Sequence, residues 1–174
     1  FLDYRRDFPN DVTYTVGSST PAKDWNFAQW DYYAKTPVWT IRFNVGNPVH
    51  GKATLTIGLT SAIPPNLPGS KTTDLVVKLN SRDVGDVRVA KTGMAGYRGG
   101  NADSVYTVAT ISFDASLLHA GMNEFTLGQR GVTPYPTDPK SHGVPGEVMY
   151  DALRLEVDAA ALAPAAPEVK ITQD

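Results

Sequence analysis

The last regular stretch of the chain constrains the fold most strongly. Residues 147–157 read EVMYDALRLEV, and from Leu153 onward apolar residues alternate strictly with charged ones. Alternation with a period of two predicts a strand with one buried side and one solvent-facing side. An irregular stretch precedes this strand and an Ala/Pro-rich tail follows it, so its partner must come from far back in the chain. A one-residue slip would expose Leu153 and Leu155 to water, and this strand therefore fixes the register of its neighbours.

The rest of the chain predicts short strands that are separated by Gly- and Pro-rich turns. These strands are expected at residues 12–16, 38–45, 53–59, 74–79, 86–89, 105–113 and 123–127. The pair 38–45 and 53–59 is expected to form a hairpin, with 60–73 as a loop and 80–85 as a turn. Asp114 is expected to cap one helical turn. About eight strands of this kind predict an all-β, antiparallel β-sandwich, for which a jelly roll is the natural eight-stranded form.

Length and composition indicate one globular domain. The 174 residues divide into a predicted domain at 1–158 and an Ala/Pro-rich linker or tail at 159–174. A net charge of −2 gives no basic field for nucleic acid, and no apolar run is long enough to cross a bilayer. The absence of cysteine excludes disulfides and thiolate chemistry. Because the chain opens at Phe1, we expect an excised domain or a processed form.

Motifs for catalysis do not stand out in the sequence. The chain contains no GxSxG, HExxH or P-loop pattern, and the glycine-rich segment 93–100 lacks the GxGxxG spacing. His50, His119 and His142 have no further metal ligands at a suitable spacing. Any chain with 18 acidic residues allows a carboxylate pair for glycoside hydrolysis, but no particular pair is favoured.

Aromatic and polar side chains in the predicted connections point instead to sugar binding. Sugars are held by an aromatic ring against their apolar face and by a few polar side chains, and acidic sugars also need Lys or Arg. Trp25 and Trp30 lie in the densest aromatic stretch, although they are equally placed to cover one end of the core. The complete set of candidate ligand-binding residues is Trp25, Trp30, Lys91, Tyr97, Arg98 and Asn101.

Asp151 interrupts the apolar residues of the closing strand. As a carboxylate at this position it either faces water, accepts hydrogen bonds from backbone amides, or binds a structural Ca²⁺ together with oxygen ligands from the N-terminal segment. The sequence leaves these three interpretations open.

Four stretches, in order, carry a family resemblance. They are 12–30 (VTYTVGSSTPAKDWNFAQW), 39–45 (WTIRFNV), 90–97 continuing into 105–127 (with FDASLLHAGMNEFTL), and 147–157 (EVMYDALRLEV). Together they resemble the C-terminal domain of rhamnogalacturonan lyases of polysaccharide lyase family 4. The closing stretch is the most specific, and the loop at 131–146 and the Ala/Pro tail depart from the family pattern.

The resemblance implies a galactose-binding-like jelly roll that serves as a carbohydrate-binding module. It implies an extracellular location and pectic polysaccharide as the ligand, either the rhamnogalacturonan I backbone or its side chains. It also implies a catalytic domain elsewhere in the same polypeptide, and no catalytic residue is carried over to this chain. The alternatives are a structural domain that packs on a neighbouring lyase domain without binding sugar, and an independent polysaccharide-degrading enzyme.

Overall fold

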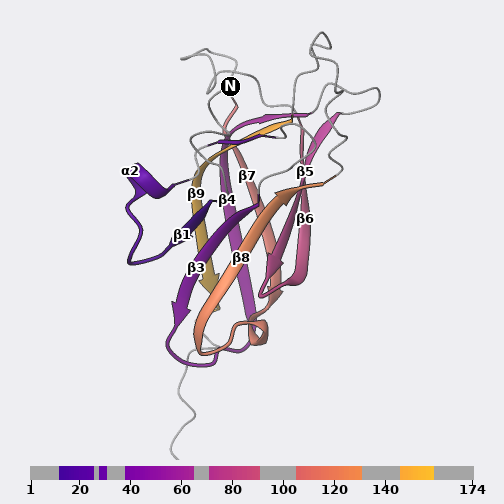
Figure 1. The fold of residues 1–174 in the computed structure, drawn as a ribbon. Coiled ribbons are helices and arrows are strands. Elements are labelled where there is room, and N and C mark those ends of the chain that lie inside the picture. Colours follow the sequence, from indigo (N-terminus) through magenta and orange to yellow (C-terminus); the bar gives the residue numbers. More distant parts are fainter. Residues whose placement is uncertain are drawn as a thin grey trace, which may run out of the picture.

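A computed structural model describes residues 12–25, 28–30, 38–64, 71–90, 105–130 and 146–158. Their elements are β1 (Thr13–Thr15), α2 (Pro21–Asp24), β2 (Ala28–Trp30), β3 (Trp39–Val45), β4 (Lys52–Ile63), β5 (Thr72–Leu79), β6 (Arg82–Ala90), β7 (Thr107–Asp114), the 3₁₀ turn η1 (Ala115–Leu117), β8 (Gly121–Gln129) and β9 (Glu147–Val157). The strands form a five-stranded sheet in the order β1-β3-β8-β5-β6 and a four-stranded sheet in the order β2-β9-β4-β7 (Figure 1).

The two sheets form the predicted β-sandwich. All strand pairs are antiparallel except the short edge pair of β1 with β3, which is parallel. The described residues hold nine strands where about eight were expected, because the aromatic stretch contributes β2. No helix in the described residues has the length and hydropathy to cross a bilayer.

The core lies between the inner faces of the sheets. Burying each large aliphatic side chain there contributes roughly 1.5–3 kcal/mol, and the alternation predicted for β3, β4 and β5 is confirmed. The largest apolar side chains in this core include Trp39, Ile57, Leu59, Leu75, Leu79, Leu127 and Tyr150. The Gln29 side chain on β2 ties the two sheets together, because it donates to the Leu127 carbonyl on β8 (2.9 Å) and accepts from the Tyr150 hydroxyl on β9 (2.8 Å).

The closing strand β9 pairs far back in the chain, as the sequence predicts. It runs antiparallel to β4 from Ala53, opposite Val157, to Ile63, opposite Glu147. Two bulges interrupt this ladder: Asp151 is the extra residue on β9 and Thr60 is the extra residue on β4. Each inserted residue shifts which side chains face inward. The apolar side chains of β9 that pack on the core are therefore Val148 and Tyr150 before Asp151, and Leu153, Leu155 and Val157 after it.

The predicted hairpin of 38–45 with 53–59 is wrong. β3 pairs with β1 and β8 in the five-stranded sheet, whereas β4 pairs with β7 and β9 in the other. The connection between them crosses from one sheet to the other, and Val49 within it is buried in the core. Alternation identifies the buried face of a strand but not its neighbour, so two consecutive strands facing one core look the same in sequence as a hairpin.

The boundaries of the next two elements also need correction. β4 continues through Thr60 to Ile63, so the expected loop at 60–73 is shorter, and residues 65–70 lie outside the described part of the chain. The expected turn at 80–85 is only Asn80 and Ser81, whose φ angles are +49° and +67°. Two residues with positive φ form the tight connection that matches strand twist, and β6 begins immediately afterwards.

Asp114 caps the 3₁₀ turn η1, as predicted. Next to this turn, the buried side chain of Asn123 organises one end of the sandwich. The Asn123 side chain donates to the carbonyls of His119 (2.7 Å) and Gly121 (3.0 Å). Its Oδ1 accepts from the backbone N–H of His119 (3.1 Å) and from the Asn80 side chain (2.8 Å). Asn80 in turn accepts from the backbone N–H of Glu124 (3.0 Å). One amide therefore holds the loop before β8 against the β5–β6 turn.

Glu147 is buried at the start of β9, and one of its two carboxyl oxygens is unsatisfied among the described residues. Its side chain is 1% exposed, and Oε1 has no hydrogen-bond partner within the described structure. Desolvation disfavours the charged carboxylate and raises the pKa of Glu147 to about 7. The folded protein therefore holds a proton here that the unfolded chain releases at lower pH.

Replacing Asn123 with Ala is expected to lower the free energy of unfolding by about 2–4 kcal/mol, because several buried backbone groups lose their partner. Chemical denaturation of the domain measures this change. Asn44→Ala, at an exposed position of β3, is the matched control and should change stability by less than about 0.5 kcal/mol. Equal losses in both variants would contradict the assigned role of Asn123.

The raised pKa of Glu147 gives a second expectation. Because its folded pKa of about 7 exceeds the ordinary value of 4.5, the contribution of this group to stability is full below pH 4.5 and declines as pH rises to about 7. The loss amounts to about 3 kcal/mol. Glu147→Gln should remove this decline and stabilise the protein above pH 7.

Unfolding free energies measured across this pH range for wild type, Glu147→Gln and Glu156→Gln provide the comparison. Glu156 is an exposed carboxylate on the same strand, so its variant should keep the decline. If Glu147→Gln also keeps the decline in full, the carboxyl of Glu147 is not the group responsible.

Candidate functional site

The structure describes only some of the residues that were predicted to bind ligand. Lys91, Tyr97, Arg98 and Asn101 lie outside the described residues. The backbone of Trp30 belongs to β2 and pairs with Glu147, and its side chain also lies outside the described part.

Trp25 is described, and its surroundings favour the interpretation as a core cover. Its indole makes edge contacts with Tyr14 and Trp39, with ring centroids 5.3 and 4.8 Å away. Its Nε1 donates to the Tyr150 carbonyl at 3.4 Å. The ring is half-buried against the core cluster, so most of its contact area is already used by the protein itself.

Asp151 lies on the outer face of the four-stranded sheet, where the bulge on β9 turns it towards solvent. Its Oδ2 accepts a hydrogen bond from the Tyr106 hydroxyl at 3.2 Å. No group of three or more His, Cys, Asp or Glu side chains gathers within the described structure in a way that would hold a metal ion. The further Ca²⁺ ligands expected from the N-terminal segment lie outside it, so the ion at Asp151 stays a prediction.

Tyr106 is a residue that the sequence analysis did not select. It directly precedes β7, is 52% exposed, and reaches across β4 to Asp151 on β9. Gly58 on β4 makes room for it: a Cβ atom at this position would collide with the Tyr106 hydroxyl and would lie 3.0 Å from its Cζ atom. An aromatic ring is therefore fixed on a sheet surface that is open to solvent.

The pKa of Tyr106 agrees with this geometry. Loss of hydration around the hydroxyl raises the pKa of the phenol, and the hydrogen bond to the Asp151 carboxylate and its charge raise it further. The phenol is consequently a neutral hydrogen-bond donor at neutral pH, and Asp151 is its acceptor.

Polar rows continue along the same face beyond Tyr106. The three strands place Ala152, Gly58 and Val108 side by side, then Arg154, Thr56 and Thr110, then Glu156, Thr54 and Ser112. We call these three rows with Tyr106 and Asp151 the outer strip. The hydroxyls of Thr54 and Ser112 lie 3.2 Å apart, and Arg154 pairs with Glu156 at 2.7 Å.

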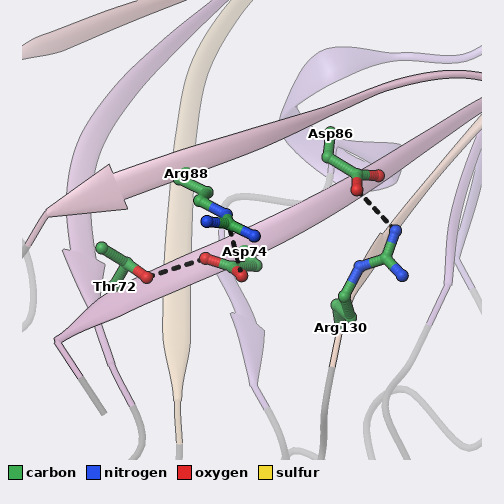
Figure 2. A network of polar contacts seen from close by, with 5 residues as sticks. All are labelled: Thr72, Asp74, Asp86, Arg88 and Arg130. Carbon is green, nitrogen blue, oxygen red and sulfur yellow. Dashed lines mark hydrogen bonds and ion pairs between the residues drawn. The ribbon is translucent and has the colours of Figure 1, made fainter. Parts of the chain in front are cut away.

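The outer face of the five-stranded sheet is different in character. Asp74 accepts a hydrogen bond from Thr72 at 2.8 Å and pairs with Arg88 at 3.5 Å, and Arg130 pairs with Asp86 at 2.6 Å. Figure 2 shows how these side chains lie. Further cross-strand pairs on this face are Arg42 with Glu124 and Lys78 with Asp83. These exposed ion pairs are each worth at most about 1 kcal/mol. The charged side chains on this face are therefore exposed to solvent and already paired with one another.

An apolar cleft is the second candidate. It has a volume of about 340 Å³ and lies between the sheets, where β3 and β9 run beyond their short edge partners β1 and β2. Its lining includes Phe43 and Val45 from β3 and Leu153, Leu155 and Val157 from β9. Asn44 and Arg154 are the polar residues in a lining that is otherwise apolar, so the cleft offers few partners to sugar hydroxyls and is better suited to an apolar protein surface.

Two sequence signals could have identified the aromatic site. Tyr106, just before β7, and Val108 within β7 both place large side chains on the outward side, and Gly58 stands in the middle of a strand. A glycine inside a strand often marks the close approach of another group. The sequence did not reveal that Tyr106 and Val108 at the start of β7 lie near Gly58 on β4 and Asp151 on β9, because the predicted hairpin placed β4 beside β3.

Known proteins show similarity over most of the chain. A family model described as “CBM-like: Polysaccharide lyase family 4, domain III” matches residues 2–155. The chain is 33% identical to the probable rhamnogalacturonate lyase B of Aspergillus flavus over 182 residues, which cover 89% of this chain and 27% of that protein. It is 31% identical to the rhamnogalacturonate lyase of Dickeya dadantii, and this match covers 87% of this chain and 23% of that protein. The chain thus spans about a quarter of the length of these curated relatives.

Among solved structures, the chain is similar to a family 35 carbohydrate binding module from an environmental isolate. The sequence identity is 12% and the TM-score is 0.40, and the match covers 73% of this chain and 77% of that one.

Proposed function

The chain belongs to the CBM-like domain III family of polysaccharide lyase family 4, and from this membership we propose that it is a non-catalytic carbohydrate-binding domain. The observation that carries the proposal is Tyr106, an aromatic ring held open to solvent on a sheet face beside hydroxyl-bearing side chains. Such a ring offers an apolar face to a sugar, and neighbouring hydroxyls supply the hydrogen bonds.

Pectic polysaccharide is the ligand class that we propose. The curated relatives are named as rhamnogalacturonate lyases, so a binding domain of this family would hold rhamnogalacturonan I, through its backbone or its side chains. The proposed location is extracellular, where pectin is found.

We propose that the catalytic domain lies elsewhere in the same polypeptide. The sequence contains no catalytic motif that we could identify, and the chain matches about a quarter of each curated relative. A binding domain with an affinity between millimolar and micromolar, about 4–8 kcal/mol, would raise the local substrate concentration for a tethered enzyme.

The residues predicted in the connections remain part of the proposal. Lys91 and Arg98 would meet uronate carboxylates, and Trp30, Tyr97 and Asn101 would supply stacking and hydrogen bonds. The structural Ca²⁺ at Asp151 also remains a proposal. Binding that weakens in Arg98→Ala and falls with added salt would support the charged contacts; affinity unchanged in Arg98→Ala would remove Arg98 from the site.

A structural role is the second candidate, and the apolar cleft favours it. An open apolar surface between the sheets would be covered if a neighbouring lyase domain packed against β3 and β9. In that case, backbone amides of these strand edges should exchange more slowly in the full-length protein than in the isolated domain. Equal exchange rates would count against docking at the cleft.

Affinity electrophoresis of the purified domain tests the main proposal. Gels that contain rhamnogalacturonan, homogalacturonan, galactan or arabinan should retard the domain in at least one case, whereas a gel without polysaccharide gives the reference mobility. Repeating the runs with calcium and with a chelator shows whether an ion takes part. Unchanged mobility in every pectic gel would reject the binding function and favour the structural role.

A further inference from the structure

We propose that the outer strip of the four-stranded sheet binds a short stretch of neutral sugar chain, with Tyr106 as the stacking ring. This inference rests on the proposed carbohydrate-binding function and adds to it a location and a ligand class. Among the ligands named above, it selects the neutral side chains of the galactan or arabinan type over the acidic backbone.

The first argument is that Tyr106 is exposed and yet held in place. Its hydroxyl is fixed by Asp151, and the tip of the ring rests over Gly58, which is itself covered. An exposed aromatic side chain normally has rotamer freedom that binding must remove. Here the hydrogen bond and the glycine gap have already restricted the ring, which lowers the entropic cost of binding.

The second argument is that two irregular features converge on this ring. The bulge on β9 directs Asp151 outward, and the glycine at position 58 leaves a gap in the side-chain row of β4. A glycine within a strand and a broken ladder each weaken a sheet. Their combined effect on this face is to seat Tyr106 over the centre of the sheet, and the core gains no contact from that placement.

The third argument concerns the polar rows beside the ring. Thr56 and Thr110 form the next row, and Thr54 and Ser112 the row after it. Hydroxyls both donate and accept, which matches the dual character of sugar hydroxyls. From Gly58 to Thr54 the strip spans four residues of β4, about 13 Å, which is the scale of a short oligosaccharide rather than a single sugar.

The charge of the strip decides the ligand class. Arg154 is paired with Glu156 at 2.7 Å, and Asp151 adds a carboxylate beside the ring. Beyond the last row of the strip, Lys52 stands between Asp114 and Asp158. Among the described residues on this face, two cations thus lie near four carboxylates, so a uronate would meet a net negative charge there. A neutral sugar meets no such penalty.

Titration of the purified domain with neutral galactan and arabinan oligosaccharides, by calorimetry or by chemical shifts, tests the inference. Tyr106→Ala should weaken binding at least tenfold. Tyr106→Phe, which keeps the ring but loses the bond to Asp151, should weaken it less. The control is Met122→Ala, since Met122 is 54% exposed on β8 of the other sheet; this variant should bind as wild type does. Thermal unfolding of each variant confirms that the fold is kept.

Salt and acidic ligands complete the design. Binding to the neutral oligosaccharides should not change between about 0.05 and 0.5 M salt, because no ion pair forms. If wild type and Tyr106→Ala bind equally, the outer strip is not the site although the proposed function stands. If rhamnogalacturonan backbone or polygalacturonate binds more tightly than the neutral oligosaccharides, and this binding is lost in Tyr106→Ala, the proposed ligand class of the strip is overturned. If wild type binds no sugar at all, the proposed function itself fails.

Discussion

The pairing of β9 with β4 is the interaction on which the rest of this structure depends. It joins the last strand to one from the first half of the chain and forms the centre of the four-stranded sheet. β2 and β7 add to its two sides, and the inner side chains of β9 complete one wall of the core. This ladder contains the bulges at Asp151 and Thr60, so the pairing that closes the fold is also irregular. That irregularity lies on the outer face, where Asp151 holds Tyr106.

The two outer faces of the sandwich have separate characters for physical reasons. On the five-stranded sheet, acidic and basic side chains alternate across neighbouring strands and neutralise one another. On the four-stranded sheet, small and hydroxyl-bearing residues leave an aromatic ring uncovered. A face whose charges are already paired with each other contributes little binding free energy to a ligand. An exposed ring with nearby hydroxyls can replace its contacts with water by contacts with sugar at a small desolvation cost. The family membership and the local chemistry therefore both support the proposed carbohydrate binding, and the local chemistry favours this face for it.

Hydrogen bonding distinguishes the parts that hold the fold from the part proposed to bind. Asn123 and Gln29 are buried, and their side-chain amides bond to several protein groups. Tyr106 makes one side-chain hydrogen bond that the structure describes, and half of its surface faces water. By residue type alone, Trp25 would be as good a sugar-stacking candidate as Tyr106. Its ring, however, already contacts Tyr14 and Trp39, and its indole N–H donates to a backbone carbonyl. Exposure and remaining bonding capacity, rather than residue type, separate the two aromatics.

The sequence by itself determined the sandwich, the buried faces of β3, β4, β5 and β9, and the cap at Asp114, because period-two alternation and capping are local properties. It also carried the family resemblance. Only the tertiary structure decided that β3 and β4 belong to different sheets, since strand partners depend on contacts between distant segments. For the same reason it alone placed Tyr106 over Gly58 and beside Asp151. Gly58 lies on β4, Asp151 on β9 and Tyr106 just before β7, so their meeting follows from strand order and from a bulge that no local pattern encodes.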